Sequence, residues 1–185
     1  YFAFAIKSVK NDIHVSFELA IKSLGYGLSY YNTEPQTWEL KGFGAKVYDD
    51  YGHHPTEILA VANAVKKRKY NHSWVLFQPH TFSRTKALLD DFASVLTNFD
   101  NIIVTDIYAA REKDTLGVSS MDIVNEVEAL DRKALYISNF DDIIDFLKRE
   151  IQPGDIVLTQ GAGTITTLGR KLANPSFTQD YSVKP

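Results

Sequence analysis

The sequence predicts an α/β fold, a Rossmann-like doubly wound domain whose mostly parallel sheet carries helices on both faces. From Ala45 onward, short runs rich in β-branched residues alternate with longer stretches of helical spacing, five times in succession. Such alternation is typical of parallel sheets covered by helices. Right-handed crossovers then wind the chain onto both faces, and ligands are expected at the carboxyl ends of the strands.

The expected strands are short apolar runs bounded by turn residues. The run SWVLFQ, at 73–78, is almost continuously apolar, which is typical of a strand buried on both faces. Pro153 and Gly154 form a turn before the last run. The five runs are 45–49, 73–78, 101–106, 133–137 and 155–160.

The expected helices follow these strands and begin with recognisable signals. Pro55 suits a first helical turn, where its missing N–H needs no partner. Ser119 or Ser120 can cap the third helix, and Asp141 and Asp142 favour the positive end of the fourth. The five helices are expected at 55–69, 83–96, 121–130, 140–148 and 164–172.

The amino-terminal stretch lacks this regular pattern. Residues 12–19 alternate like a strand of a half-solvated sheet, and residues 29–37 are polar and aromatic. We interpret residues 1–40 as the remnant of a preceding domain with its linker, 41–175 as the regular domain, and 176–185 as a tail. Because the chain starts at Tyr1 without Met, we expect it to be a fragment.

Composition excludes several classes of function. The 185 residues carry a net charge of −3, which argues against duplex nucleic acid as a partner. The absence of cysteine excludes disulfides and thiol nucleophiles and fits a cytoplasmic protein. No apolar run is long enough to span a membrane, and the sequence contains neither a P-loop nor a G-x-S-x-G elbow.

The first strand ends in a dense polar block, DDYGHHP at 49–55. Helix amino ends attract anions. A carboxylate at such an end can bind a ribose hydroxyl or hydrated Mg²⁺. A histidine there can bind an anion or relay a proton. The alternative is a helix cap with solvated histidines. Because a cap needs only one such residue, the whole block favours a functional site.

Three other strand ends carry candidate residues. Arg84 is expected in the first turn of a helix, where a cation opposes the dipole unless it binds an anion; a plain surface arginine is an equal alternative. Arg111 lies in a long polar loop of a kind that is often functional, although on these residues alone a solvated charge cluster is the favoured interpretation. The turn Gly161–Gly163 only partly matches a dinucleotide fingerprint, so we expect close backbone approach there.

Four sequence blocks together resemble a known family, the UDP-N-acetylmuramate–L-alanine ligases of the Mur ligase family, in their carboxy-terminal domain. The similarity runs from about Trp38 to Leu172. It rests on DDYGHHPTEI at 49–58, FQPHTFSRT at 77–85, TDIYAAREKD at 105–114 and TQGAGTI at 159–165.

This resemblance implies an ATP-dependent ligase that joins L-alanine to UDP-N-acetylmuramate through an acyl phosphate, with Mg²⁺ bridging phosphates. It implies three domains, of which this chain would be the Rossmann-like lid, inactive alone because the P-loop and the metal ligands lie elsewhere. The partners implied are ATP, L-alanine and UDP-N-acetylmuramate, with neither nucleic acid nor membrane.

The resemblance also implies roles for individual residues. Asp50 would contact the ribose of ATP, whereas Tyr51, His53 and Arg84 would bind L-alanine. It assigns no catalytic residue and no metal ligand to this chain. Asp49, His54, His80 and Arg111 are further candidates.

Two positions depart from the pattern of the family. Thr81 stands where some members carry a second arginine, which leaves a two-arginine clamp in doubt. Thr164 replaces the Asn or Asp common after GAG, so its role is open.

Two alternative functions remain at this stage. One is the lid of the related ligase that attaches recycled murein tripeptide to the same sugar, although residues 78–85 favour the alanine enzyme. The other is a stand-alone nucleotide- or amino-acid-binding domain without catalysis.

Overall fold

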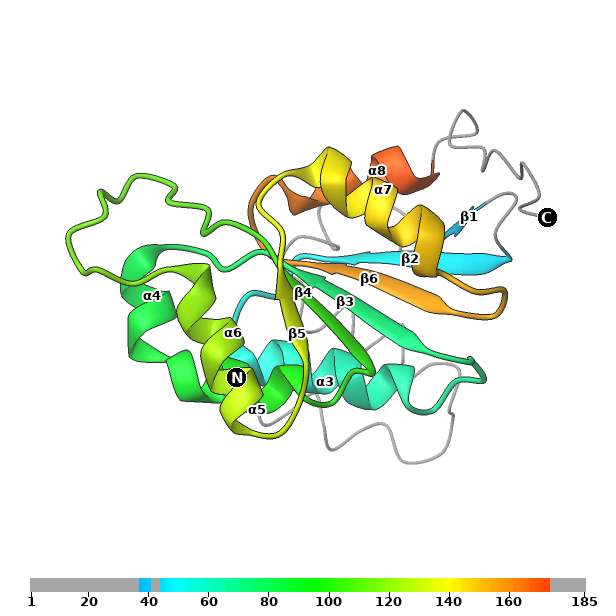
Figure 1. Ribbon diagram of the computed structural model, residues 1–185, viewed down its shortest axis with the longest axis horizontal. Helices are drawn as coiled ribbons and strands as arrows, with labels where there is room; N and C mark the ends of the chain where they lie inside the picture. The colour runs from blue at the N-terminus through cyan, green and yellow to red at the C-terminus, as the bar shows by residue number, and fades with distance from the viewer. Residues whose placement is uncertain (1–36, 41–43, 174–185) are drawn as a thin grey trace, which may run out of the picture.

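The computed structural model describes residues 37–40 and 44–173, which form a twisted six-stranded sheet between two layers of helices (Figure 1). The order in the sheet is β1-β2-β6-β3-β4-β5, and every neighbouring pair from β2 to β5 is parallel. This confirms the predicted α/β fold. The strands are β1 Thr37–Leu40, β2 Ala45–Asp50, β3 Ser73–Phe77, β4 Asn101–Val104, β5 Ala134–Tyr136 and β6 Ile156–Gln160.

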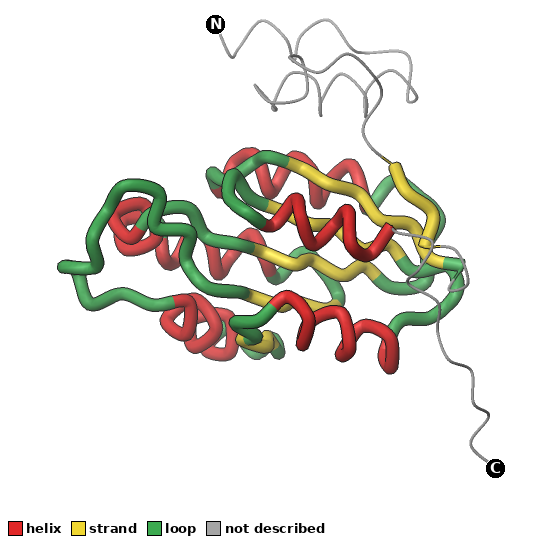
Figure 2. The backbone as a smooth tube through the Cα atoms, turned by 90° about the horizontal axis from the view of Figure 1, so that it is seen from above, coloured by secondary structure: helices red, strands yellow, loops and turns green. Residues whose placement is uncertain are grey.

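The helices cover both faces of the sheet, as the doubly wound topology requires. On one face lie α3, α5 and α6, and on the other α7 and α8 (Figures 1 and 2). None of the helices within 44–173 has the length and apolar character needed to cross a membrane. Their bounds are α3 Pro55–Val65, α4 Phe82–Ala87, α5 Leu89–Leu96, α6 Ser120–Ala129, α7 Phe140–Glu150 and α8 Ile165–Ala173.

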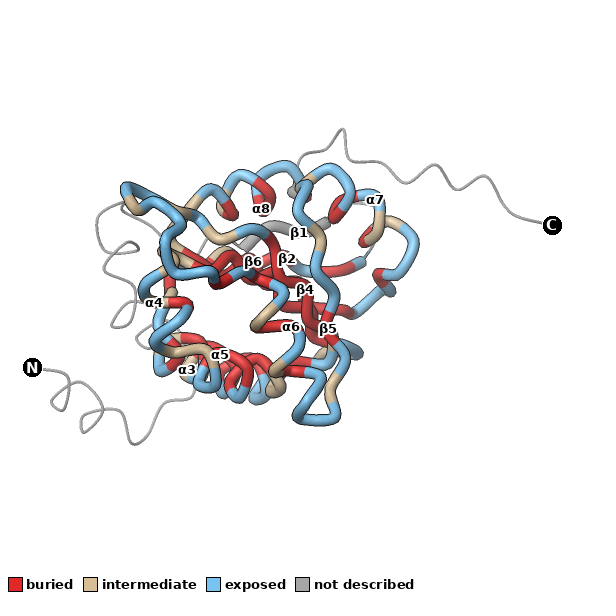
Figure 3. The backbone as a smooth tube through the Cα atoms, turned by 60° about the vertical axis from the view of Figure 1, so that its left-hand side comes forward, coloured by how far each residue is buried: buried red, intermediate tan, exposed pale blue. Residues whose placement is uncertain are grey.

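Two apolar cores lie on the two faces of the sheet, and successive residues of each central strand alternate between them. In β3, Val75 and Phe77 face the α3–α5–α6 layer, while Trp74 and Leu76 face α7 and α8. All five residues of β3 are buried, which confirms the strand predicted from its continuous apolar run. Figure 3 shows the buried strands at the centre of the molecule, with exposed loops and helix faces around them.

Three elements differ from the sequence-based expectation. The single helix expected at 83–96 is two helices, because Leu88 has φ −123° and ψ 26° and ends α4. Asp90 and Asp91 lie in the first turn of α5, where carboxylates are favourable. The first helix ends at Val65 rather than near residue 69. Strand β1 was not predicted, and it pairs antiparallel with β2. The strand expected at 12–19 lies outside the described residues.

The sheet order brings three distant segments together at one edge. Strand β6, the last in the chain, pairs with both β2 and β3 and separates them. The carboxyl ends of β2, β6 and β3 are therefore adjacent. Ligands of doubly wound folds bind at such edges, where the direction of winding changes.

Candidate functional site

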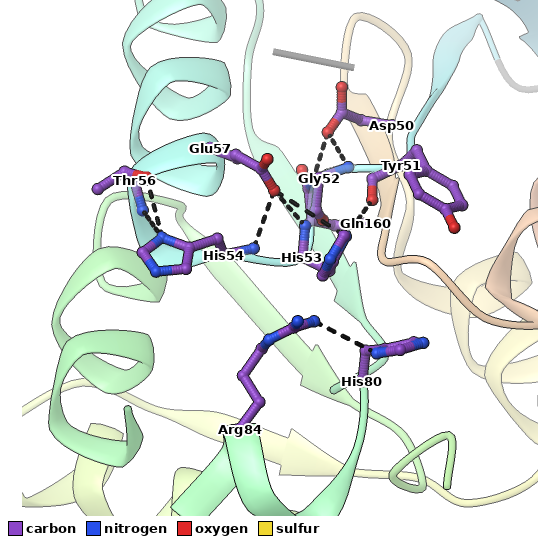
Figure 4. A network of polar contacts seen from close by, with 10 residues as sticks. All are labelled: Asp50, Tyr51, Gly52, His53, His54, Thr56, Glu57, His80, Arg84 and Gln160. Atoms are coloured by element: carbon purple, nitrogen blue, oxygen red, sulfur yellow. Dashed lines mark hydrogen bonds and ion pairs between the residues drawn. The ribbon is translucent and has the colours of Figure 1, made fainter. Parts of the chain in front are cut away.

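The candidate site lies on the segments that follow β2 and β3. Figure 4 shows Tyr51 and His53 from the first segment, and His80 and Arg84 from the second, converging on one region. The rings of Tyr51 and His53 are 5.6 Å apart, and those of His53 and His80 are 5.3 Å apart. The structure thus brings together residues that are about thirty positions apart in the sequence.

The start of α3 is held by a capping box. The side chain of Glu57 accepts hydrogen bonds from the backbone N–H groups of His53 and His54, at 2.8 and 3.0 Å. His54 is the N-cap, and its Nδ1 accepts from the N–H of Thr56 at 3.3 Å. The capping alternative therefore holds for His54, whereas the ring of His53 is free to face His80.

Arg84 and His80 form a polar pair. The guanidinium Nη1 of Arg84 donates to Nδ1 of His80 at 3.3 Å. Burial lowers the pKa of His80, and the neighbouring His53 and Arg84 lower it further. A neutral His80 is the form that accepts this bond, because a guanidinium can only donate.

The turn before α4 is strained and held by a carboxylate from another loop. Thr81, the N-cap of α4, has φ +66°, a conformation that is uncommon for a β-branched residue. The carboxylate of Glu112 accepts the N–H of Ser83 at 2.9 Å and also its hydroxyl group. These bonds lower the pKa of Glu112. The loop after β4 thereby fixes the helical turn that carries Arg84.

Asp50 is a buried carboxylate, and only one of its two oxygens has hydrogen-bond partners. Its Oδ1 accepts from the N–H of Gly52 at 2.8 Å and from the side-chain amide of Gln160 at 2.5 Å. Its Oδ2 has no hydrogen-bond partner, and neither has Oε1 of Gln160. Burial raises the pKa of Asp50 from its ordinary 3.8 to about 6. A buried acceptor without a donor is costly, so this oxygen suits a ligand that donates.

Asp49 is engaged inside the domain. Its Oδ1 accepts the hydroxyl of Thr159 at 2.6 Å, and its Oδ2 accepts that of Thr166 at 2.8 Å. Burial raises the pKa of Asp49. Because both oxygens bind threonines of β6 and α8, Asp49 ties those elements to β2.

The glycine turn after β6 confirms the expected close backbone approach. A Cβ on Gly161 would lie 2.6 Å from the carbonyl oxygen of Gln78, and one on Gly163 would lie 2.4 Å from Oε1 of Gln78. That same Oε1 accepts the N–H of Ile165, while the side-chain amide of Gln78 donates to Thr164 at 3.1 Å. Thr164 and Gln78 together hold the start of α8.

The loop after β4 places Arg111 on the exposed surface. A shallow polar cleft of about 560 Å³ opens beside Asp106 and Tyr108 of the same loop and reaches Lys171 of α8. Within 44–173, no group of three or more His, Asp or Glu side chains is arranged to hold a metal ion.

Sequence reasoning missed several residues of this region. Glu57 could have been found, since it stands three positions after a helix cap, as in a capping box. Gln78, Glu112 and Gln160 form contacts across 29 to 110 positions of sequence, and no local pattern predicts such contacts.

Comparison with known proteins identifies the family. Residues 38–163 match the family described as Mur ligase, glutamate ligase domain. The chain belongs to the Mur ligase family. Among its relatives, the UDP-N-acetylmuramate–L-alanine ligase of Caldanaerobacter subterraneus is 51% identical over 136 residues, which are 72% of this chain and 30% of that protein. The corresponding ligase of Lachnospira eligens is 43% identical over 148 residues, 79% of this chain and 32% of that protein.

Solved structures of Mur ligases share the fold. The UDP-N-acetylmuramate–alanine ligase of Thermotoga maritima aligns with a TM-score of 0.55 at 23% identity, over 69% of this chain and 26% of that one. A murein peptide ligase from Psychrobacter arcticus aligns with a TM-score of 0.63 at 19% identity, over 80% of this chain and 30% of that one. The chain spans about a third of the length of its curated relatives.

Proposed function

We propose that this Mur ligase domain belongs to a ligase that joins L-alanine to UDP-N-acetylmuramate in peptidoglycan precursor synthesis. Relatives carrying that name are 38–51% identical to this chain. The observation that carries the proposal is the pairing of Arg84 with His80 beside His53 at the carboxyl edge of the sheet. These groups offer one planar cation and two imidazoles in a small region.

The amino acid would bind between the two segments. The Arg84 guanidinium can take a carboxylate with two parallel N–H bonds, which a lysine cannot do. Tyr51 is 48% exposed and packs edge-on against His53, so its ring can cover the small methyl group of alanine. Thr81, the N-cap of α4, stands where some members of the family carry a second arginine. The carboxylate site therefore depends on Arg84.

The nucleotide would bind next to the amino acid. We assign Asp50 to a ribose hydroxyl, because its Oδ2 is an acceptor that lacks a donor. One related structure, a MurF ligase from Thermotoga maritima, is described in complex with ADP. ATP would supply the phosphate that activates the sugar carboxylate, with Mg²⁺ held by other parts of the full-length enzyme. Since ATP and UDP-sugars are cytoplasmic substrates, we place the reaction in the cytoplasm.

The roles of the remaining candidates follow from their contacts. His80 would position Arg84, and His54 and Asp49 would hold α3 and α8 rather than the substrate. Arg111 is exposed on the loop after β4 and is available to an anion brought by another domain.

The test uses the full-length ligase that contains this chain, supplied with ATP, Mg²⁺ and UDP-N-acetylmuramate. Phosphate release is followed after adding L-alanine to one sample and murein tripeptide to another. Stimulation by L-alanine alone is expected. Stimulation by the tripeptide alone would assign the chain to the recycling ligase, and stimulation by neither would favour a binding domain without catalysis.

A further inference from the structure

The hydrogen bonds of His53 fix which nitrogen of its ring carries the proton. Nδ1 lies 3.1 Å from the carbonyl oxygen of Tyr51. A carbonyl oxygen can only accept, so Nδ1 is the protonated nitrogen in the neutral ring. The lone pair of His53 is therefore on Nε2, and the side chain is 24% exposed, so a ligand can reach it.

His80 has the opposite arrangement. Its Nδ1 accepts from Arg84 at 3.3 Å, which leaves the proton on Nε2. The two rings, 5.3 Å apart, are thus one acceptor and one donor. Of the pair, only His53 has a free basic nitrogen.

Glu57 lies beside the ring of His53. Its Oε2 lies 4.0 Å from Nδ1 of His53, and it is held there by the N–H groups of His53 and His54. Because 4.0 Å is too long for a hydrogen bond, the carbonyl oxygen of Tyr51 orients the ring, and the carboxylate of Glu57 contributes its charge and its hold on the backbone. The other charged or titratable groups facing this ring are Tyr51, His80 and Arg84.

The spacing fits an α-amino acid. Its nitrogen lies about 2.5 Å from its carboxyl carbon. Arg84 contacts His80, and the rings of His80 and His53 are 5.3 Å apart, so the three side chains border one region (Figure 4). An α-amino acid whose carboxylate binds Arg84 would have its amino group on the side of His53. L-Alanine enters as an ammonium ion, which cannot attack a carbonyl until it loses a proton.

We propose that His53 is the general base of the ligation step and that Glu57 is its positioning residue, an inference that rests on the proposed function. The alanine ammonium gives one proton to Nε2 of His53. The freed nitrogen lone pair attacks the carbonyl carbon of the acyl phosphate and forms the C–N bond. The C–O bond to phosphorus-bound oxygen breaks, and phosphate leaves with that electron pair and the second proton of the amine. His53 then releases its proton to water.

The experiment compares two nucleophiles in the full-length ligase. Hydroxylamine is already unprotonated at neutral pH, so it traps the acyl phosphate as a hydroxamate without needing a base. The test variant is His53→Asn, whose amide keeps a donor at the position of Nδ1 but has no basic atom. The control is His72→Asn, the same change at a half-exposed histidine whose Nδ1 lies 3.2 Å from Asp155 at the opposite edge of the sheet.

His53→Asn should lower kcat for L-alanine at pH 7 by about 100- to 10,000-fold while leaving ATP-dependent hydroxamate formation near the wild-type rate. Its deficit with alanine should shrink as pH rises, because hydroxide then deprotonates the amine. Glu57→Gln keeps one oxygen that can accept both capping N–H groups and removes the charge, so it should cause a smaller fall confined to alanine. His72→Asn should change neither reaction.

Two results would overturn the inference. An equal loss of alanine ligation and hydroxamate formation in His53→Asn would mean that His53 has a structural role. Retention of full alanine ligation would mean that another group is the base. If the wild-type enzyme forms neither product, the proposed function itself fails, and the inference fails with it.

Discussion

At the scale of single residues, the proposed carboxylate site depends on the positive charge of Arg84. Replacing it with alanine should raise KM for L-alanine about 10- to 150-fold, since one charge-assisted hydrogen bond contributes on the order of 1.5–3 kcal/mol. KM for ATP should change little. Steady-state kinetics of the full-length enzyme measure both values. Arg84→Lys is the matched control, because it keeps the charge but not the planar fork, and it should restore only part of the affinity.

An equal rise of both KM values in Arg84→Ala would contradict the carboxylate role. The result would then point to general disorder of the turn before α4. His80, whose Nδ1 accepts from Arg84, is the residue to replace next.

Asp50 makes a separate prediction about pH and stability. Its pKa is about 6 in the folded chain and 3.8 ordinarily, so folding favours the protonated form. Between these values the unfolded chain loses its proton first, and stability falls as pH rises from about 4 to about 6 and then levels off. Asp50→Asn removes this cost while its side-chain oxygen can still accept from Gly52.

Asp50→Asn should therefore be more stable than wild type at pH 7–8, by on the order of 1–3 kcal/mol, and equal to it near pH 4. Urea unfolding of both proteins across this pH range gives the difference directly, and other titrating groups cancel. A constant difference at all pH values would show that ionisation of Asp50 is not its source. The same variant should weaken nucleotide binding, because an amide does not carry the charge of a carboxylate.

At the scale of elements, the turn between β6 and α8 tests how tightly the sheet edge is packed. Gly161 has φ +144° and no room for a Cβ, since the carbonyl of Gln78 would be 2.6 Å away. Gly161→Ala should destabilise the domain by about 2–4 kcal/mol through strain and the forced shift of Gln78. Gly117→Ala is the control, because Gly117 has φ +61° but nothing within 4 Å of its Cβ position.

Gly117→Ala should cost only the left-handed backbone penalty, about 1–2 kcal/mol. Chemical unfolding of both variants separates backbone strain from steric contact. Equal losses would mean that the Gln78 carbonyl moves aside at no cost.

The elements that the sequence predicted well share a physical property. Strands such as β3 are apolar on both faces, and helices such as α7 begin with a cap and acidic first-turn residues, so local sequence alone determines them. Strand β1, by contrast, was missed, and it is defined by its pairing with β2. Such tertiary contacts leave no local pattern.

For the candidate site, sequence reasoning predicted residues at strand ends but not the partners that hold them. The block that contains Asp50 and His53 was singled out, like Arg84, because parallel strands end at one edge, and the resemblance to the family implied their individual roles. The contacts that orient them come from Gln160, Glu57 and Glu112, and two of these act from other segments of the chain. Which of two neighbouring histidines caps α3 and which faces the site also required the structure.

At the scale of the whole molecule, the site lies on an open edge. Its side chains project from one end of the sheet, and the cleft beside them is shallow, so substrates would remain in contact with water. An acyl phosphate hydrolyses unless water is excluded, and domain closure is the usual means of excluding it. The 185-residue sequence also contains no P-loop to hold ATP phosphates.

We therefore expect the 185-residue chain alone to release no phosphate from ATP and to form no product with UDP-N-acetylmuramate and L-alanine. The measurement is phosphate release by the purified chain, with the full-length ligase as the positive control under the same conditions. Circular dichroism tests whether the chain is folded, so that misfolding can be excluded as the cause of inactivity. Turnover by the chain that is abolished by Arg84→Ala would show that this domain holds a complete active site, and the assignment of a lid would be wrong.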